Sequence, residues 1–281
     1  MSYRIQPDGT VERRNAFSSV ISIFVTDPKK TKAIIIRKLS DIAAEYGIQI
    51  VFACESGSRA WQFPSPDSDY DVRFIYIRPF EDYLSVSERN DQIGFLTDGE
   101  LDICGWDIRK ALQLTRKSNT TLFEWLQSPI VYLQQPGFRD ELWALCEQYF
   151  DRRSNIHHYL GIAHGALETM GSEGEIKIKK LFYVLRPLLA AKWCVENDSI
   201  APMFILPLMC LMPKNLQQLT TDLIALKSTK NEDHMVEIAP ELKQFIAHEF
   251  ATCTEAAADM QKQYFEVAPL DVFFRKIIKP K

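Results

Sequence analysis

Two short motifs carry the side chains best suited to chemistry. Gly57 and Ser58 follow the apolar stretch IQIVFAC, from which Glu55 and Ser56 separate them. Eleven residues after Ser58, Asp69 and Asp71 stand at the start of a second apolar stretch. Side chains alternate along a strand, so these two carboxylates would project from one face. Carboxylates this close repel each other and raise each other's pKa unless a cation lies between them. The spacing therefore predicts a cation site.

Magnesium is the cation that fits this pattern, with Mn²⁺ as the alternative, because Mg²⁺ takes oxygen ligands from carboxylates and substrate phosphates. The Gly57-Ser58 turn supplies what phosphates need. Glycine lets the backbone approach closely, and exposed N–H groups with a serine hydroxyl can hold anionic oxygens. We therefore expect a metal-bound nucleotide between the two motifs.

A third acid would complete such a site. Asp102 lies in a short apolar strand candidate, residues 101–104, where a carboxylate would otherwise be poorly tolerated. It would complete a metal site or accept the proton of the acceptor hydroxyl. Asp107 is the alternative third acid, although its place before IRKAL favours a role as a helix N-cap.

Several segments together resemble a known family. GSRAW, then SDYDVRFIYI, then DICGWDIRKAL and LFEWLQSPIVY resemble the polymerase-beta-like nucleotidyltransferase superfamily, and more closely its RNA-repair-pathway branch, RlaP. The resemblance implies magnesium-dependent transfer of a nucleoside monophosphate from a nucleoside triphosphate, ATP as first choice, onto a hydroxyl group. It implies Asp69, Asp71 and Asp102 as catalytic and metal-binding residues. It implies Gly57 and Ser58 as triphosphate-binding residues, and we expect the other nucleotide-binding residues to be Arg59, Ser68, Lys179, Tyr183 and Arg186.

The last three of those residues come from the one basic run of the chain. Residues 176–193 contain no acid, and Lys179, Tyr183 and Arg186 share a helix face at spacings of four and seven. That face could close over the β- and γ-phosphates, with arginine suited to bidentate contact. A solvated helix face is the alternative interpretation. Arg59 could also reach phosphate, whereas Arg73 would balance the charge of Asp69 and Asp71.

The elements that position these residues are strands and helices in the first half and helices in the second. Apolar, β-branched runs predict strands over 48–54, 70–77, 101–104 and 130–133. Helical periodicity predicts helices over 28–47, 108–117, 122–126, 140–150, 156–170, 176–195, 216–226 and 242–265. We therefore predict an α+β protein with a mixed-sheet catalytic domain, residues 1–138, and a helical domain, residues 139–281, that closes the nucleotide cleft.

Composition limits the remaining functions. The chain of 281 residues has 33 basic and 37 acidic side chains, a net charge of −4 that argues against a sequence-independent nucleic-acid coat. A short RNA end in a cleft remains compatible. Six cysteines without a CxxC pair predict free thiols in a reducing cytoplasm, and the histidines give no zinc motif. The start lacks a secretory signal, and the most apolar stretch, 201–212, is too short to cross a bilayer.

The sequence favours a cytoplasmic nucleotidyltransferase acting on an RNA end, in RNA repair or modification. The alternatives are a protein AMP-transferase, a small-molecule acceptor, or a nucleotide-binding regulatory module without turnover. Convergence of Asp102 with Asp69 and Asp71 favours the enzyme over the binding module. The oligomeric state and the base preference are not encoded in these motifs.

Overall fold

A computed structural model describes residues 3–5, 11–13, 28–96, 101–171 and 174–279. Its centre is a mixed sheet in the order β2-β1-β5-β6-β4-β3-β7. The pair β4 and β6 is parallel, whereas the other neighbours are antiparallel. The strands are β1 (Tyr3–Ile5), β2 (Val11–Arg13), β3 (Gln49–Glu55), β4 (Tyr70–Ile77), β5 (Gln92–Leu96), β6 (Leu101–Asp107) and β7 (Val131–Gln134).

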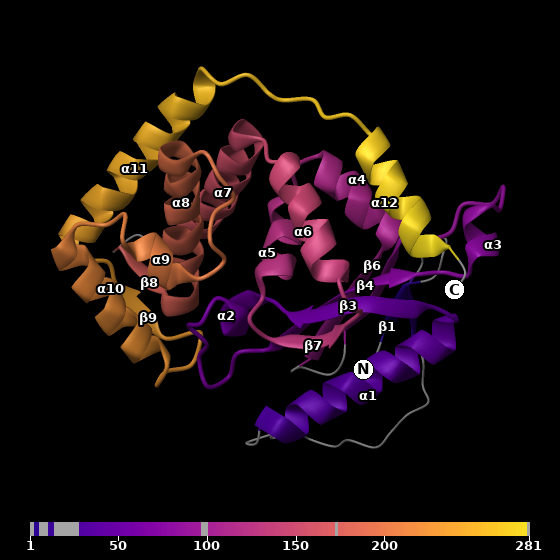
Figure 1. Cartoon of the computed structure of the whole chain (residues 1–281). Helices are drawn as coiled ribbons and strands as arrows, with labels where there is room; N and C mark the ends of the chain where they lie inside the picture. The colour runs from indigo at the N-terminus through magenta and orange to yellow at the C-terminus, as the bar shows by residue number, and fades with distance from the viewer. Residues whose placement is uncertain (1–2, 6–10, 14–27, 97–100, 172–173, 280–281) are drawn as a thin grey trace.

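Helices cover both faces of this sheet (Figure 1). Helix α1 (Pro28–Tyr46) buries Ile35 and Leu39 against one face, where it meets Val72 and Phe74 of β4. The other face packs against α4 (Ile108–Arg116), α5 (Thr120–Gln127), α6 (Phe138–Gln148) and α12 (Ala268–Ile278). Burial alternates along β4, so Asp71 and Arg73 project on the side of Ile75, away from α1.

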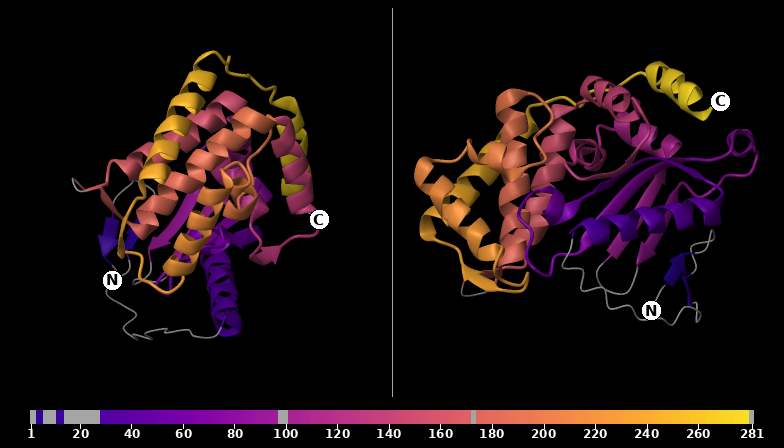
Figure 2. Two further views of the ribbon diagram at one scale, coloured as in Figure 1. Left: turned by 90° about the vertical axis from the view of Figure 1, so that its left-hand side faces the viewer. Right: turned by 60° about the horizontal axis from the view of Figure 1, so that its bottom comes forward.

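The second half of the chain forms a separate core of helices at one end of the sheet (Figure 2). Its centre is α8 (Ile178–Asn197), which packs against α7 (Arg152–Leu167) and α11 (Pro240–Ala258). The remaining elements are α2 (Gly57–Ala60), α3 (Phe80–Tyr83), β8 (Glu175–Lys177), α9 (Ile205–Met209), α10 (Lys214–Lys227) and β9 (Met235–Glu237). In the described part of the chain, we find no helix that combines the length and apolar character of a membrane span.

The α+β prediction is confirmed, and so is the placement of most elements. The boundary between residues 138 and 139 stays a prediction. Helices α6 and α12 follow that position in sequence but share a core with β3 and α4. In the other direction, Phe63 of the first half belongs to the helical core, where it stacks on Phe182 at 4.9 Å between ring centroids.

Two predicted elements had clearly wrong limits, and several short strands were missed. Strand β6 continues to Asp107 instead of ending at Cys104, because Gly105 makes room for the Phe74 ring; a Cβ there would lie 2.2 Å from it. The helix predicted over 242–265 ends at Ala258, and a second helix, α12, starts with a proline in its first turn. Strands β1, β2, β5, β8 and β9 were not predicted, because each has only three to five residues and gives a weak sequence pattern.

Candidate active site

Asp71 and Asp102 lie side by side on neighbouring parallel strands. They are Cα partners in the register of β4 and β6, and so their side chains leave the same face of the sheet. The exposed fraction of the side chain is 37% for Asp102 and 27% for Asp71. The structure therefore brings the second motif and the predicted third acid together where β4 and β6 begin.

Arg73 joins these two carboxylates. Its Nη2 donates to Oδ1 of Asp71 at 3.0 Å and to Oδ2 of Asp102 at 2.7 Å, and Nη1 donates to the Asp102 carbonyl at 3.2 Å. Arg73 was expected to balance the charge of Asp69 and Asp71; its carboxylate partners in the structure are Asp71 and Asp102. A fixed guanidinium thus offsets part of the repulsion that the strand register creates.

The acids still act strongly on one another. Burial raises the pKa of Asp71, and the charges of Asp102 and Asp69 raise it further while Arg73 lowers it. Partial burial also raises the pKa of Asp69, with contributions in the same direction from Glu232 and Asp102. Asp69 itself is exposed just before β4. The three predicted acids therefore form one electrostatic cluster.

Gly57 fits against this cluster because it has no side chain. Its φ of +61° suits glycine, and a Cβ at this position would lie 2.1 Å from Oδ2 of Asp71. The preceding residue, Ser56, donates its N–H to the Asp71 carbonyl at 2.8 Å. The turn after β3 is thereby fixed directly beside the second motif.

Glu55, the last residue of β3, connects the two motifs through its side chain. Its side chain is fully buried, and Oε1 accepts the backbone N–H of Asp71 at 2.8 Å while Oε2 accepts the hydroxyl of Tyr132. Burial raises the pKa of Glu55 to about 7, although both hydrogen bonds favour the ionised form. Sequence analysis did not identify Glu55, even though an acid at the end of an apolar strand is a signal in itself.

Ser58 and Ser68 form a chain of hydrogen bonds. The hydroxyl of Ser58 donates to Oγ of Ser68 at 3.2 Å, and Ser68 donates to Oε1 of Glu232 at 2.7 Å. The other carboxylate oxygen of Glu232 forms an ion pair with Lys179, near the start of α8. The structure therefore brings Ser58, Ser68 and Lys179 together, through an acid that sequence analysis did not single out.

Arg59 contacts the backbone of the same loop and not the Ser58 and Ser68 hydroxyls. It donates to the carbonyls of Ser68 and Asp69 at 2.7 and 3.1 Å, and its guanidinium lies 3.9 Å from the centre of the Tyr70 ring. Arg59 thus braces the loop that ends at Asp69.

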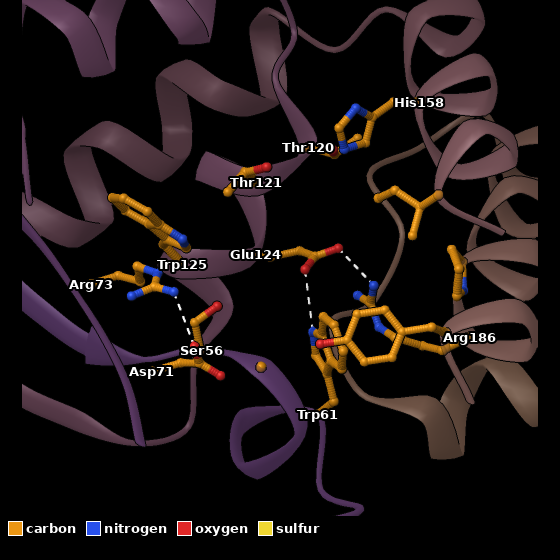
Figure 3. Close-up of a pocket in the computed structure, with 14 residues that line it drawn as sticks. Ser56, Trp61, Asp71, Arg73, Thr120, Thr121, Glu124, Trp125, His158 and Arg186 are labelled. Carbon is orange, nitrogen blue, oxygen red and sulfur yellow. Dashed lines mark hydrogen bonds and ion pairs between the residues drawn. The ribbon is translucent and has the colours of Figure 1, made fainter. Parts of the chain in front are cut away.

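A pocket of about 230 Å³ begins at Asp71 and extends toward the helical half of the chain. Tyr183 and Arg186 of α8 contribute to its wall, one and two turns beyond Lys179. Figure 3 shows Glu124 of α5 near the centre, facing Arg186 and Trp61. Its carboxylate accepts Nη1 of Arg186 at 2.8 Å and the indole N–H of Trp61 at 3.2 Å. Arg186 is only 2% exposed, so the pair is buried between the two halves.

Asp107, the alternative third acid, caps α4. Its Oδ1 accepts the N–H of Arg109 at 2.8 Å, and Oδ2 accepts the hydroxyl of Tyr83 at 3.1 Å. Since Asp107 lies at the far end of β6 from Asp102, it stands apart from the acidic cluster. Trp106 and Trp125 stack on each other at 3.8 Å, as expected of core aromatic residues.

The donor set suits a divalent cation. Carboxylate oxygens are the ligands that Mg²⁺ prefers. Asp71 already pairs with one cation, Arg73, through Oδ1, and Gly57 has no Cβ to fill the space beside Oδ2. Within the described residues no group of three or more acidic, histidine or cysteine side chains is arranged as a complete metal site. Substrate phosphates would therefore have to supply the remaining ligands.

Comparison with known proteins places this geometry in context. The family described as RlaP, the RNA repair pathway DNA polymerase beta family, matches residues 31–276. An uncharacterized protein, YcgL of Bacillus subtilis (strain 168), is 38% identical over 232 residues, which is 82% of this chain and 89% of that protein. The range matched by the family includes both motifs, Asp102 and most of the helical half.

Proposed function

This chain belongs to the RNA repair pathway DNA polymerase beta family, and on that premise we propose that it is a magnesium-dependent nucleotidyltransferase. It would move a nucleoside monophosphate from a nucleoside triphosphate, ATP being the first to test, to a hydroxyl group at an RNA end. The observation that carries this proposal is the pairing of Asp71 with Asp102 across two parallel strands, beside the Gly57 turn.

Asp69 and Asp71 would hold the metal ion together with phosphate oxygens. The chemistry that a bound Mg²⁺ supplies is neutralisation of charge on the phosphates and on the attacking oxygen. Arg73 holds Asp71 and Asp102 in place through its shared Nη2 and lowers the pKa of Asp71. Asp71 is therefore aligned before the substrate enters, which reduces the cost of ordering the site.

Asp102 is the base in this proposal. The acceptor hydroxyl oxygen forms a bond to the α-phosphorus, and its proton passes to a carboxylate oxygen of Asp102. The bond between the α-phosphorus and the bridging oxygen breaks, and pyrophosphate leaves with that electron pair. The half-exposed position of Asp102 at the edge of the site is compatible with access by an acceptor.

The pocket beyond Asp71 would take the nucleoside. Trp61 and Tyr183 offer aromatic surfaces on which a base can stack, and Glu124 offers a hydrogen-bond acceptor. The pocket is smaller than the roughly 300 Å³ at which sites for drug-sized ligands begin. A single nucleoside suits this size better than a folded RNA, so the RNA end would reach the site from the Asp102 side.

Transfer from four α-labelled nucleoside triphosphates tests the proposal. Each is supplied with magnesium and an RNA pool, a protein lysate or no acceptor, and the Asp69→Ala/Asp71→Ala double variant serves as control. Label on RNA with the wild type alone is the expected result. Label on protein instead would identify a protein AMP-transferase. Binding of a triphosphate without transfer to any acceptor would favour a regulatory module.

A further inference from the structure

We propose that the carboxylate of Glu232 occupies the place of the nucleotide's terminal phosphate, and that it leaves this place when the substrate binds. The inference rests on the proposed function, since it concerns the same nucleotide. It adds a residue of the helical half that occupies the phosphate position until a triphosphate displaces it.

The groups around Glu232 form a cradle for an anion. Ser68 donates its hydroxyl hydrogen to Oε1 at 2.7 Å, and Lys179 pairs with Oε2. Ser68 in turn accepts from the hydroxyl of Ser58 and from the N–H of Ser65, at 3.2 and 2.9 Å. The hydrogen bonds from Ser58 and Ser65 therefore run through Ser68 to Glu232. The same donors would serve a phosphate oxygen equally well.

The charges near the cradle favour exchange of one anion for another. Glu232 lies close to Asp67, whose carboxylate accepts the Glu232 N–H at 3.1 Å, and its charge also acts on Asp69. Lys179 is the cation that contacts the Glu232 carboxylate directly. A terminal phosphate carries more negative charge than a carboxylate, so it competes better for Lys179, above all with metal bound at Asp69 and Asp71.

The position of Glu232 in the chain allows it to leave. It lies between α10 and β9, outside both elements, whereas its cradle comes from the loop before β4 and from α8. Its neighbour Asp233 points outward and pairs with Lys177 at 2.6 Å, with 82% of its side chain exposed. A rotation of one side chain would free the cradle without unfolding either element.

Discrimination among nucleotides follows from this arrangement. A nucleoside triphosphate gains the contacts that Glu232 gives up, whereas a monophosphate cannot reach them from the α-phosphate position. Glu232 thus holds the cradle closed, and a triphosphate must displace it, which weakens the apparent affinity for triphosphates.

Calorimetry with the α,β-methylene analogue of ATP, with tripolyphosphate and with AMP tests this inference. Glu232→Gln keeps an acceptor for Ser68 but removes the charge, and Asp233→Asn removes the same charge one residue away. Removing a like charge from the phosphate position is expected to lower the dissociation constants of the analogue and of tripolyphosphate by about fivefold or more. Asp233→Asn and AMP binding should change little.

The outcomes separate the two proposals. If the wild type binds the analogue and Glu232→Gln binds it no more tightly than Asp233→Asn does, the role of Glu232 is overturned while the proposed function stands. If neither the wild type nor any variant binds a nucleoside triphosphate, both fall. Should Glu232→Gln fold poorly, Glu232→Asp withdraws the carboxylate while keeping the charge, and a smaller gain in affinity is expected.

Discussion

The Cα of Gly57 faces the carboxylate of Asp71 so closely that a Cβ would lie 2.1 Å from Oδ2. The first motif and the second are therefore in direct contact across β3 and β4, and the phosphate turn and the metal-binding acid act as one unit. Gly57 also holds a φ of +61°, which costs a non-glycine residue about 1–2 kcal/mol.

Gly57→Ala is accordingly expected to displace the Asp71 carboxylate. A misplacement of this size lowers kcat roughly 100-fold, measured as pyrophosphate release. Gly137→Ala is the matched control, because Gly137 also has a positive φ but lies outside the site, with Glu141 Oε1 at 3.4 Å as its nearest neighbour. The control should lose stability and keep activity. Equal activity of the two variants would show that the Gly57 contact is unimportant.

Arg73→Gln is expected to move the acidic limb of the pH–activity profile to higher pH. Arg73 lowers the pKa of Asp71, and without it Asp102 and Asp69 would raise that pKa further. Because the proposed reaction needs ionised carboxylates, activity would then begin at a higher pH. Arg89→Gln, which removes an exposed pair with Asp82, serves as control. Superimposable profiles for wild type and Arg73→Gln would contradict the role given to Arg73.

The sequence singled out the acids that the structure brings together, but not their partners. Alternation along one strand predicted a shared side for Asp69 and Asp71, and Asp102 stood out as an acid in an apolar strand. Their pairing with Arg73 depends on the parallel register of β4 and β6, which involves residues about thirty positions apart. Local patterns do not encode such a register.

The partners from the helical half were also beyond local patterns. Glu232 and Lys179 meet because β8, just before α8, pairs with β9, just after Glu232. The loop carrying Ser65 and Ser68 is fixed beside them through Phe63 and Lys227, the latter donating to Ser65 at 2.8 Å. Glu124 did leave a signal, as the acid within the apolar segment LFEWL. Its partner Arg186 could not be inferred, since tertiary packing alone brings α5 beside α8.

Glu55→Gln is expected to flatten the dependence of stability on pH. The pKa of Glu55 rises from 4.5 to about 7 on folding, so the folded state holds this proton more tightly than the unfolded state. The contribution of this proton to the free energy of unfolding is complete below pH 4.5 and is lost as the pH rises to about 7. The change is on the order of 3 kcal/mol. Denaturant unfolding of both proteins across this range measures it. Parallel curves for the two proteins would contradict the raised pKa.

Glu124 and Arg186 are expected to contribute strongly to stability when only one of them is replaced. Arg186→Met would leave the buried carboxylate of Glu124 without its cation, which costs about 3–5 kcal/mol. The double variant Glu124→Leu/Arg186→Met should recover much of this loss, since it removes both charges. Thermal unfolding of the single and double variants provides the test. Additive losses would show that the two residues are not coupled.

The central claim is that Asp71 and Asp102 form the reacting centre, and magnesium-dependent pyrophosphate release tests it most directly. The rate is measured for the wild type, Asp71→Asn, Asp102→Asn and Asp107→Asn, with thermal unfolding as a check on folding. Loss of several kcal/mol of charge stabilisation predicts a decrease of about 1,000-fold for the first two variants. Asp107→Asn, which alters only the cap of α4, should lose some stability and retain turnover. Wild-type turnover by folded Asp71→Asn would contradict the account.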